Sequence, residues 1–279
     1  MGLNPKEKKM HKLAFTTLGC PEWSFTKILD EAQKMGYSGI EIRGIDGKML
    51  AEEMTQFFPE NRAATLAALK ARNLEMTGFG SSVNFHQADK FDSMIAEGKT
   101  TIDVCQRMGI PAIRVFGDKI PPGESDASVI ARIAKGASIL AEYGEAKGVK
   151  VLMETHGDFI TLERVKGVFD QVKSKNFKLL WDVGNTDYIY GDNFMEFYKP
   201  MKNLIVHTHI KDHFRGTPGD YSTYKYCLPG EGNIPIKAIV KQLTDDGYTG
   251  YYCLEWEKKW HPELPDPEIA YPRFVKIFK

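Results

Sequence analysis

The sequence of 279 residues lacks the features that mark several classes of protein. It has only four cysteines, and no two of them are spaced as C-x-x-C; they are Cys20, Cys105, Cys227 and Cys253. This pattern argues against a zinc knuckle or a disulfide framework and is typical of a reducing compartment. No apolar run approaches the roughly 18 residues that a membrane-spanning helix requires.

An excess of charge of either sign is also lacking. Lys and Arg together number 37, as do Asp and Glu, so the formal net charge is zero. Such a chain has no overall field that would attract nucleic acid or an anionic membrane. The basic start, MGLNPKEKKMHKLAF, is not followed by the apolar segment of a secretory signal. We therefore expect a cytoplasmic protein without a nucleic-acid or membrane partner, and leave open an export signal upstream of this sequence.

What the sequence does contain is a repeated strand-then-helix unit. Runs rich in β-branched or aromatic residues alternate with segments of helical period. Strands are predicted at 12–19, 38–44, 74–80, 111–118, 150–157, 177–184, 203–212 and 248–257. Helices are predicted at about 24–35, 59–73, 89–108, 126–147, 161–173, 193–202, 235–246 and 268–279.

Eight such pairs favour a single (β/α)₈ TIM barrel over a doubly wound sheet. A doubly wound enzyme would need a glycine-rich phosphate loop after an early strand, and the near match GEG at 230–232 lies late in the chain, in a loop. We predict one barrel domain over residues 12–279, preceded by a flexible leader at 1–11.

Polar side chains stand at the carboxyl ends of the last four predicted strands, where TIM barrels carry their active sites. These residues are Glu154, Asp182, His209 and Glu255. Each alone would be an ordinary capping, ion-pairing or core residue. Together they predict a shared divalent cation, because buried carboxylates without a partner are costly. Three carboxylates and one imidazole suit Mn²⁺, Mg²⁺ or Co²⁺ better than a structural Zn²⁺.

The segments METHGD, WDVGN, HTHIKDHFRG, PGEGNIP and CLEWE resemble the xylose isomerase-like TIM-barrel superfamily. That superfamily includes sugar-phosphate isomerases, ketose 3-epimerases, inosose and 3-dehydroshikimate dehydratases, and endonuclease IV. The resemblance implies that Glu154, Asp182, His209 and Glu255 hold one cation, with Mn²⁺ favoured and Zn²⁺ also possible. It implies that the two glutamates act as acid and base, and that Arg215 contacts the substrate.

The chain departs from the 3-epimerases at two positions. Asn185 replaces a histidine, and Ile160 replaces a second glutamate. Conversely, Glu154-Thr-His156 and His209-Ile-Lys211 resemble the dehydratases, in which the corresponding histidine is a candidate general base and the lysine contacts the substrate. Asn185 stays a candidate substrate contact. The extra histidines of the endonuclease branch are missing, which argues against DNA repair.

Several other polar residues are candidates for the pocket. Arg43 and Arg114 stand near the ends of the second and fourth strands, where they would hold a substrate anion or pair with a neighbouring acid. His207 is expected to point inward with His209, below it or as its partner, and His213 to lie in solvent. By alternation, Trp181 and Trp256 should face the helices.

Such a site favours proton abstraction next to a carbonyl. We expect a metal-dependent isomerase or epimerase acting on a sugar or sugar phosphate. One alternative is a metal-dependent dehydratase or lyase acting on a keto-polyol, and another is a carbohydrate-binding barrel without catalysis. The exact substrate, its phosphorylation, the physiological metal, the pathway and a homo-oligomeric state are left open.

Overall fold

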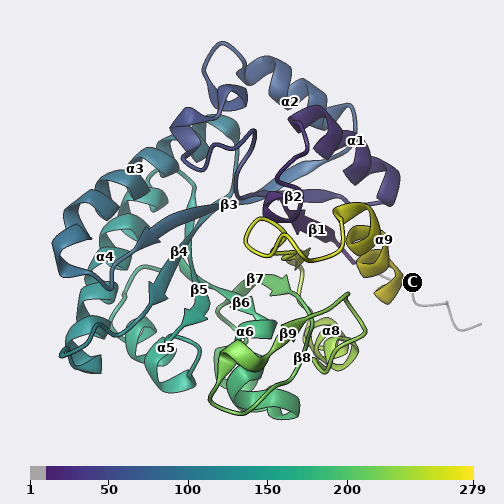
Figure 1. Ribbon diagram of the computed structural model, residues 1–279. Coiled ribbons are helices and arrows are strands. Elements are labelled where there is room, and N and C mark those ends of the chain that lie inside the picture. The colour runs from purple at the N-terminus through teal and green to yellow at the C-terminus, as the bar shows by residue number, and fades with distance from the viewer. Residues whose placement is uncertain (1–10) are drawn as a thin grey trace, which may run out of the picture.

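The computed structural model describes residues 11–279 and contains a closed ring of parallel strands (Figure 1). The ring is formed by β1 (Leu13–Thr16), β2 (Gly39–Ile42), β3 (Glu75–Asn84), β4 (Ala112–Asp118), β5 (Lys150–Gly157), β6 (Phe177–Asp182), β7 (Ile205–Ile210) and β10 (Tyr252–Leu254). Neighbouring strands follow the order β1-β10-β7-β6-β5-β4-β3-β2. The predicted (β/α)₈ barrel is confirmed.

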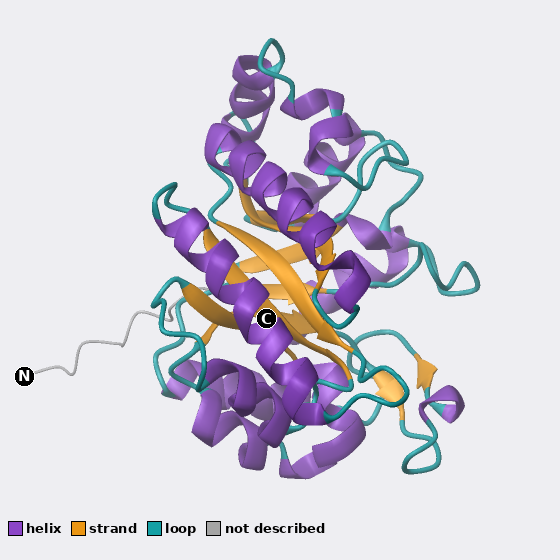
Figure 2. Ribbon diagram, turned by 90° about the vertical axis from the view of Figure 1, so that its left-hand side faces the viewer, coloured by secondary structure: helices purple, strands orange, loops and turns teal. Residues whose placement is uncertain are grey.

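Helices surround the ring, as Figure 2 shows from the side. They are α1 (Phe25–Met35), α2 (Arg62–Lys70), α3 (Phe91–Met108), α4 (Asp126–Glu145), α5 (Leu162–Phe169), α6 (Val183–Tyr190), α7 (Met195–Met201), α8 (Ile236–Asp245) and α9 (Pro267–Ile277). Local chemistry explains several of their ends. Ser24 accepts a hydrogen bond from the Lys27 N–H at the start of α1, Gly36 ends that helix at a φ of 87°, and Thr161 caps α5.

The structure corrects the predicted elements in several places. Helix α2 begins at Arg62, because Pro59 lies in a preceding turn closed by the Asn61 N–H on the Phe58 carbonyl. Helix α6 was not predicted, nor was the short antiparallel pair of β8 (His213–Phe214) and β9 (Lys225–Tyr226). The last strand of the barrel is shorter than predicted, so Glu255 follows its end.

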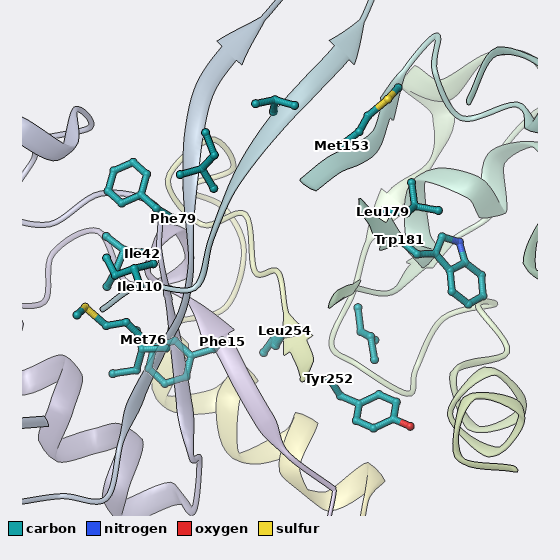
Figure 3. Packing of buried hydrophobic residues seen from close by; sticks show 14 of the residues in the cluster. Phe15, Ile42, Met76, Phe79, Ile110, Met153, Leu179, Trp181, Tyr252 and Leu254 are labelled. Carbon is teal, nitrogen blue, oxygen red and sulfur yellow. The ribbon is translucent and has the colours of Figure 1, made fainter. Parts of the chain in front are cut away.

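A thick apolar layer joins the strands to the helices. Figure 3 shows side chains of this layer, including Phe79, Leu179 and Trp181. Trp181 stacks on Phe197 and Tyr198 of α7, so its predicted outward direction is confirmed.

A smaller apolar cluster lies on the opposite face of the strands. It consists of Ala112 on β4, Leu152 on β5 and Leu180 on β6. Because strand side chains alternate, the residue two positions further along each strand lies on the same face. Those residues are Arg114, Glu154 and Asp182. On β4, β5 and β6, the inner face is therefore apolar at the level of this cluster and ionic towards the carboxyl ends of the strands.

The ends of the described chain pack against each other. His11 makes edge contacts with the rings of Tyr252 and Phe278. The rest of the predicted leader, residues 1–10, lies outside the described residues. Across residues 11–279, no helix combines the length and the apolar character needed to cross a membrane.

Candidate metal centre

The four predicted ligands meet at one end of the barrel. Glu154 lies on β5, Asp182 ends β6, His209 lies on β7, and Glu255 follows β10. Each offers a ligand atom within 4.8 Å of those of the other three, and all four residues are buried. The Nδ1 atom of His209 lies 2.9 Å from Glu154 Oε1 and 3.2 Å from Glu255 Oε1. We call these four residues the central quartet.

Two cations neutralise part of the quartet's negative charge. The Lys211 ammonium lies 2.8 Å from Asp182 Oδ2 and 2.9 Å from Glu255 Oε2, and the Arg114 guanidinium pairs with Glu154. Burial raises the pKa of Asp182 to about 7; Lys211 opposes this shift, whereas Glu255 and Glu154 reinforce it. Despite burial, Arg114 and His209 lower the pKa of Glu154, and Lys211 and His209 lower that of Glu255, so Asp182 is the carboxylate whose charge is least compensated.

The donor set fits a divalent cation. Asp182 Oδ2 receives no hydrogen bond of good geometry, although it is buried and close to Lys211. An ion between the four ligand atoms would supply the missing positive charge. Carboxylate oxygens with one imidazole suit hard or borderline divalent ions.

A cavity of about 150 Å³ adjoins the quartet. Of the predicted site residues, those that line it are Arg43, Arg114, His156, Asn185, Lys211 and Glu255. Tyr226 of β9 also lines it, and its hydroxyl donates a hydrogen bond to Glu257, which in turn accepts one from Lys211. The unpredicted hairpin β8–β9 therefore contributes to the wall of the cavity.

Individual contacts orient these lining residues. Arg43 donates a hydrogen bond to Ser82 Oγ, and burial beside Arg114 lowers the pKa of its guanidinium to about 10. The side-chain amide of Asn185 donates a hydrogen bond to the Thr155 carbonyl, and its backbone N–H donates one to Asp182 Oδ1.

An aspartate that sequence reasoning missed lies beside His156, close enough for an ion pair but without a hydrogen bond of good geometry. The Nδ1 atom of His156 lies 3.3 Å from Asp118 Oδ1, and Asp118 Oδ2 lies 3.6 Å from His86 Nδ1. Asp118 ends β4 in the left-handed region, at a φ of 65°. Such a conformation is uncommon for a residue other than glycine and often marks a functional site.

A family comparison agrees with the barrel fold. The sequence model described as xylose isomerase-like TIM barrel matches residues 29–272. The chain belongs to this family. An inosose dehydratase of Clostridium perfringens is 23% identical, with 90% of this chain and 86% of the relative covered. A fructoselysine 3-epimerase of Shigella flexneri is 24% identical, with 81% and 82% covered.

Solved structures of the family share the fold. A structure of the protein IolI with a bound zinc atom superposes with a TM-score of 0.79 at 18% identity, over 96% of this chain and 98% of that one. The family relatives thus include both dehydratases and epimerases, and the fold has been solved with a metal bound.

Arg215 and His213 belong to a second cluster of ionic groups, which contains none of the quartet's ligands. Both bond to Asp187 of α6: Arg215 through two nitrogens at 2.7 and 2.9 Å, and His213 through Nε2 at 2.9 Å. Arg215 also pairs with Asp192. The expectation that His213 is solvated was wrong, because helix α6 buries it against Asp187 and the ring of Tyr188. We call Asp187, Asp192, His213 and Arg215 the Asp187 cluster.

Sequence reasoning also missed Glu41 on β2. Its carboxylate bonds to His207 at 2.7 Å and to His209 at 3.0 Å. His207 is thus both a buried residue of the barrel interior and an indirect partner of His209. The available signal was the one used elsewhere in the chain, a carboxylate within an apolar strand, here GIEI.

Proposed function

We propose that this protein is a metal-dependent enzyme that removes a proton next to the carbonyl of a sugar or polyol. The observation that carries the proposal is the convergence of four buried ligand atoms within 4.8 Å beside a polar cavity. Glu154, Asp182, His209 and Glu255 would hold the cation, with Mn²⁺ favoured and Mg²⁺, Co²⁺ or Zn²⁺ as alternatives. When bound, the ion would act as a Lewis acid that stabilises negative charge on the substrate oxygen.

In the isomerase or epimerase version, Glu154 and Glu255 handle the proton. Each glutamate has one oxygen near His209 and another near a cation, Arg114 for Glu154 and Lys211 for Glu255. These contacts hold both carboxylates in place, so that one accepts the proton and the other returns it. The similarity to a fructoselysine 3-epimerase supports this version.

A lyase is the second candidate, and the contact between His156 and Asp118 favours it. His156 lines the cavity, and Asp118 lies 3.3 Å from its Nδ1. With a carboxylate at that nitrogen, Nε2 would accept the substrate proton as the carbon–carbon double bond forms and the β carbon–oxygen bond breaks. The same proton, returned from Nε2 to the departing hydroxyl, would complete the loss of water. The similarity to an inosose dehydratase supports this version.

The remaining predicted substrate contacts fall into two groups: the residues that line the cavity, and Arg215, which does not line it. We assign Arg43, Arg114, Asn185 and Lys211 to substrate binding, since all four line the cavity. We do not retain that role for Arg215, whose guanidinium is occupied by Asp187 and Asp192.

The test combines metal analysis with NMR of keto-sugars and keto-polyols in D₂O. Wild type is compared with Glu255→Gln and His156→Gln, and Glu75→Gln, at the start of β3, serves as a control for removal of a carboxylate. We expect about one ion per chain in wild type, and solvent deuterium at a substrate carbon. Retention of the hydroxyl identifies an isomerase or epimerase, and its loss identifies a lyase.

Two results would contradict the proposal. One is near-normal turnover of an identified substrate by both Glu154→Gln and Glu255→Gln. The other is sugar binding by metal-free protein without any exchange or conversion, which would leave a carbohydrate-binding barrel.

A further inference from the structure

A chain of buried hydrogen bonds lies on the other side of the quartet's histidine. Glu41 Oε2 lies 2.7 Å from His207 Nε2, and both carboxylate oxygens of Glu41 lie within 3.1 Å of His209 Nε2. Glu41, His207 and His209 are all buried, with 2%, 5% and 0% of their surfaces exposed. The proposed reaction assigns no role to Glu41 or His207.

The two ring nitrogens of His209 face different groups. Nδ1 faces Glu154 and Glu255 of the quartet, whereas Nε2 faces Glu41. A neutral imidazole carries one proton, and a nitrogen that binds a metal must present its lone pair. A carboxylate beside Nε2 accepts a hydrogen bond from that nitrogen, which keeps the proton there and leaves Nδ1 free.

We propose that Glu41 is a positioning residue that fixes the tautomer and the ring orientation of His209 for metal binding through Nδ1. The inference rests on the proposed function, because it assumes that the quartet holds a cation. His207 acts one step further away: its Nε2–H donates to Glu41 Oε2 and orients the carboxylate.

A second use of the same residues has to be distinguished. Glu41, His207, His209 and Cys253 also offer ligand atoms within 4.8 Å of one another, so they form another group that could hold an ion. The second group contains a single carboxylate, and both of its oxygens already lie within hydrogen-bond distance of a histidine nitrogen. The quartet contains three carboxylates and the buried Asp182 Oδ2, which receives no hydrogen bond of good geometry. The contacts therefore favour positioning over a second ion.

The main test measures metal affinity rather than turnover. Zn²⁺ and Mn²⁺ binding to metal-free wild type, Glu41→Gln and His207→Asn would be followed by calorimetry, with Glu75→Gln as the control. Removing an outer carboxylate of this kind typically weakens metal binding about 10–100-fold. We expect that loss for Glu41→Gln, a smaller one for His207→Asn and none for the control. Thermal unfolding in chelator would show whether each variant is folded.

A spectroscopic measurement tests the tautomer without relying on any variant. In Zn²⁺-loaded protein with ¹⁵N-labelled histidine, we expect His209 to be coordinated through Nδ1 and protonated at Nε2. Coordination through Nε2 would overturn the inference, as would wild-type affinity in Glu41→Gln. Two ions per chain, with one lost in Cys253→Ser, would also overturn it in favour of a second site. Absence of metal binding by wild type would instead contradict the proposed function, and the positioning role with it.

Discussion

Asp182 and Asp187 lie on the same short segment, and both are buried, with 0% and 5% of their surfaces exposed. Their pKa values nevertheless move in opposite directions. Burial raises the pKa of Asp182 to about 7, with Glu255 and Glu154 adding to the effect of burial against Lys211. At Asp187 burial also acts upward, but hydrogen bonds from Arg215 and His213 outweigh it and lower the pKa.

The two aspartates differ in how the protein compensates their charge. In the Asp187 cluster, each oxygen of the buried Asp187 carboxylate receives a hydrogen bond from Arg215, so the charge is satisfied by protein groups alone. In the central quartet, carboxylates lie beside other carboxylates; Lys211 is shared between Asp182 and Glu255, and Arg114 pairs with Glu154. A cation would thus stabilise the quartet and leave the Asp187 cluster unaffected.

The largest expected effect comes from removing a carboxylate that faces the cavity. Glu255→Gln should lower turnover about 10²–10⁴-fold, the range for loss of a general acid or base, and should also weaken metal binding. Asp187→Asn should bind metal as wild type does. Metal content and turnover are measured together in both variants. Equal metal loss in the two would remove the distinction between the clusters.

The second-largest expected effect is stabilisation of the folded protein by a bound metal ion. A cation at about 100 times its dissociation constant stabilises the folded state by about 2.7 kcal/mol, which raises the melting temperature of a chain of this length by about 5 °C. We expect this rise with Mn²⁺ in wild type and in Asp187→Asn, and little of it in Asp182→Asn. Melting curves with Mn²⁺ and with chelator check the prediction. An equal rise in Asp182→Asn would mean that the ion binds elsewhere.

The comparison also shows what sequence can predict. The quartet could be predicted because strand alternation and strand ends determine where its side chains lie in a parallel barrel. Glu41 carried the same signal, but its strand lies in the first half of the chain, outside the segments that carry the family resemblance. Its contacts with His207 and His209 join β2 to β7, a pairing across the barrel that no local pattern encodes.

The Asp187 cluster could not be predicted because the helix that carries Asp187 was not. The sequence of α6, VGNTDYIY, has weak helix formers in its first turn. Tertiary contacts override that preference: Asp182 caps the helix, and the Trp181 indole donates to Thr186 Oγ1. When α6 is not predicted, nothing in the sequence identifies Asp187 as the partner of His213, and His213 is predicted to be a solvent-exposed loop residue.

A smaller effect is expected from breaking the Asp187 cluster itself. Asp187→Asn leaves the buried ring of His213 and part of the Arg215 guanidinium without a charged acceptor, which should cost about 1–3 kcal/mol of unfolding free energy. Urea unfolding in chelator measures this loss. Arg273→Gln, at an exposed ion pair with Glu231, is the control and should change the free energy little. A loss no larger than that of the control would mean that the cluster is not stabilising.

The smallest expected effect is the pH dependence of the difference in unfolding free energy between wild type and Asp187→Asn. The pKa of Asp187 in the folded protein lies below its ordinary value of 3.8, because the hydrogen bonds from Arg215 and His213 outweigh burial. The stability that the ionised carboxylate contributes is therefore complete above pH 3.8 and is lost as the pH falls through the lower, folded value. The gap in unfolding free energy between wild type and Asp187→Asn should stay constant from pH 7 to about 5 and narrow below about pH 4. Urea titrations at pH 7, 5, 4 and 3 would follow it. A gap that narrows between pH 7 and 5 would show instead that Asp187 titrates like the crowded Asp182, and the contrast between the two clusters would fail.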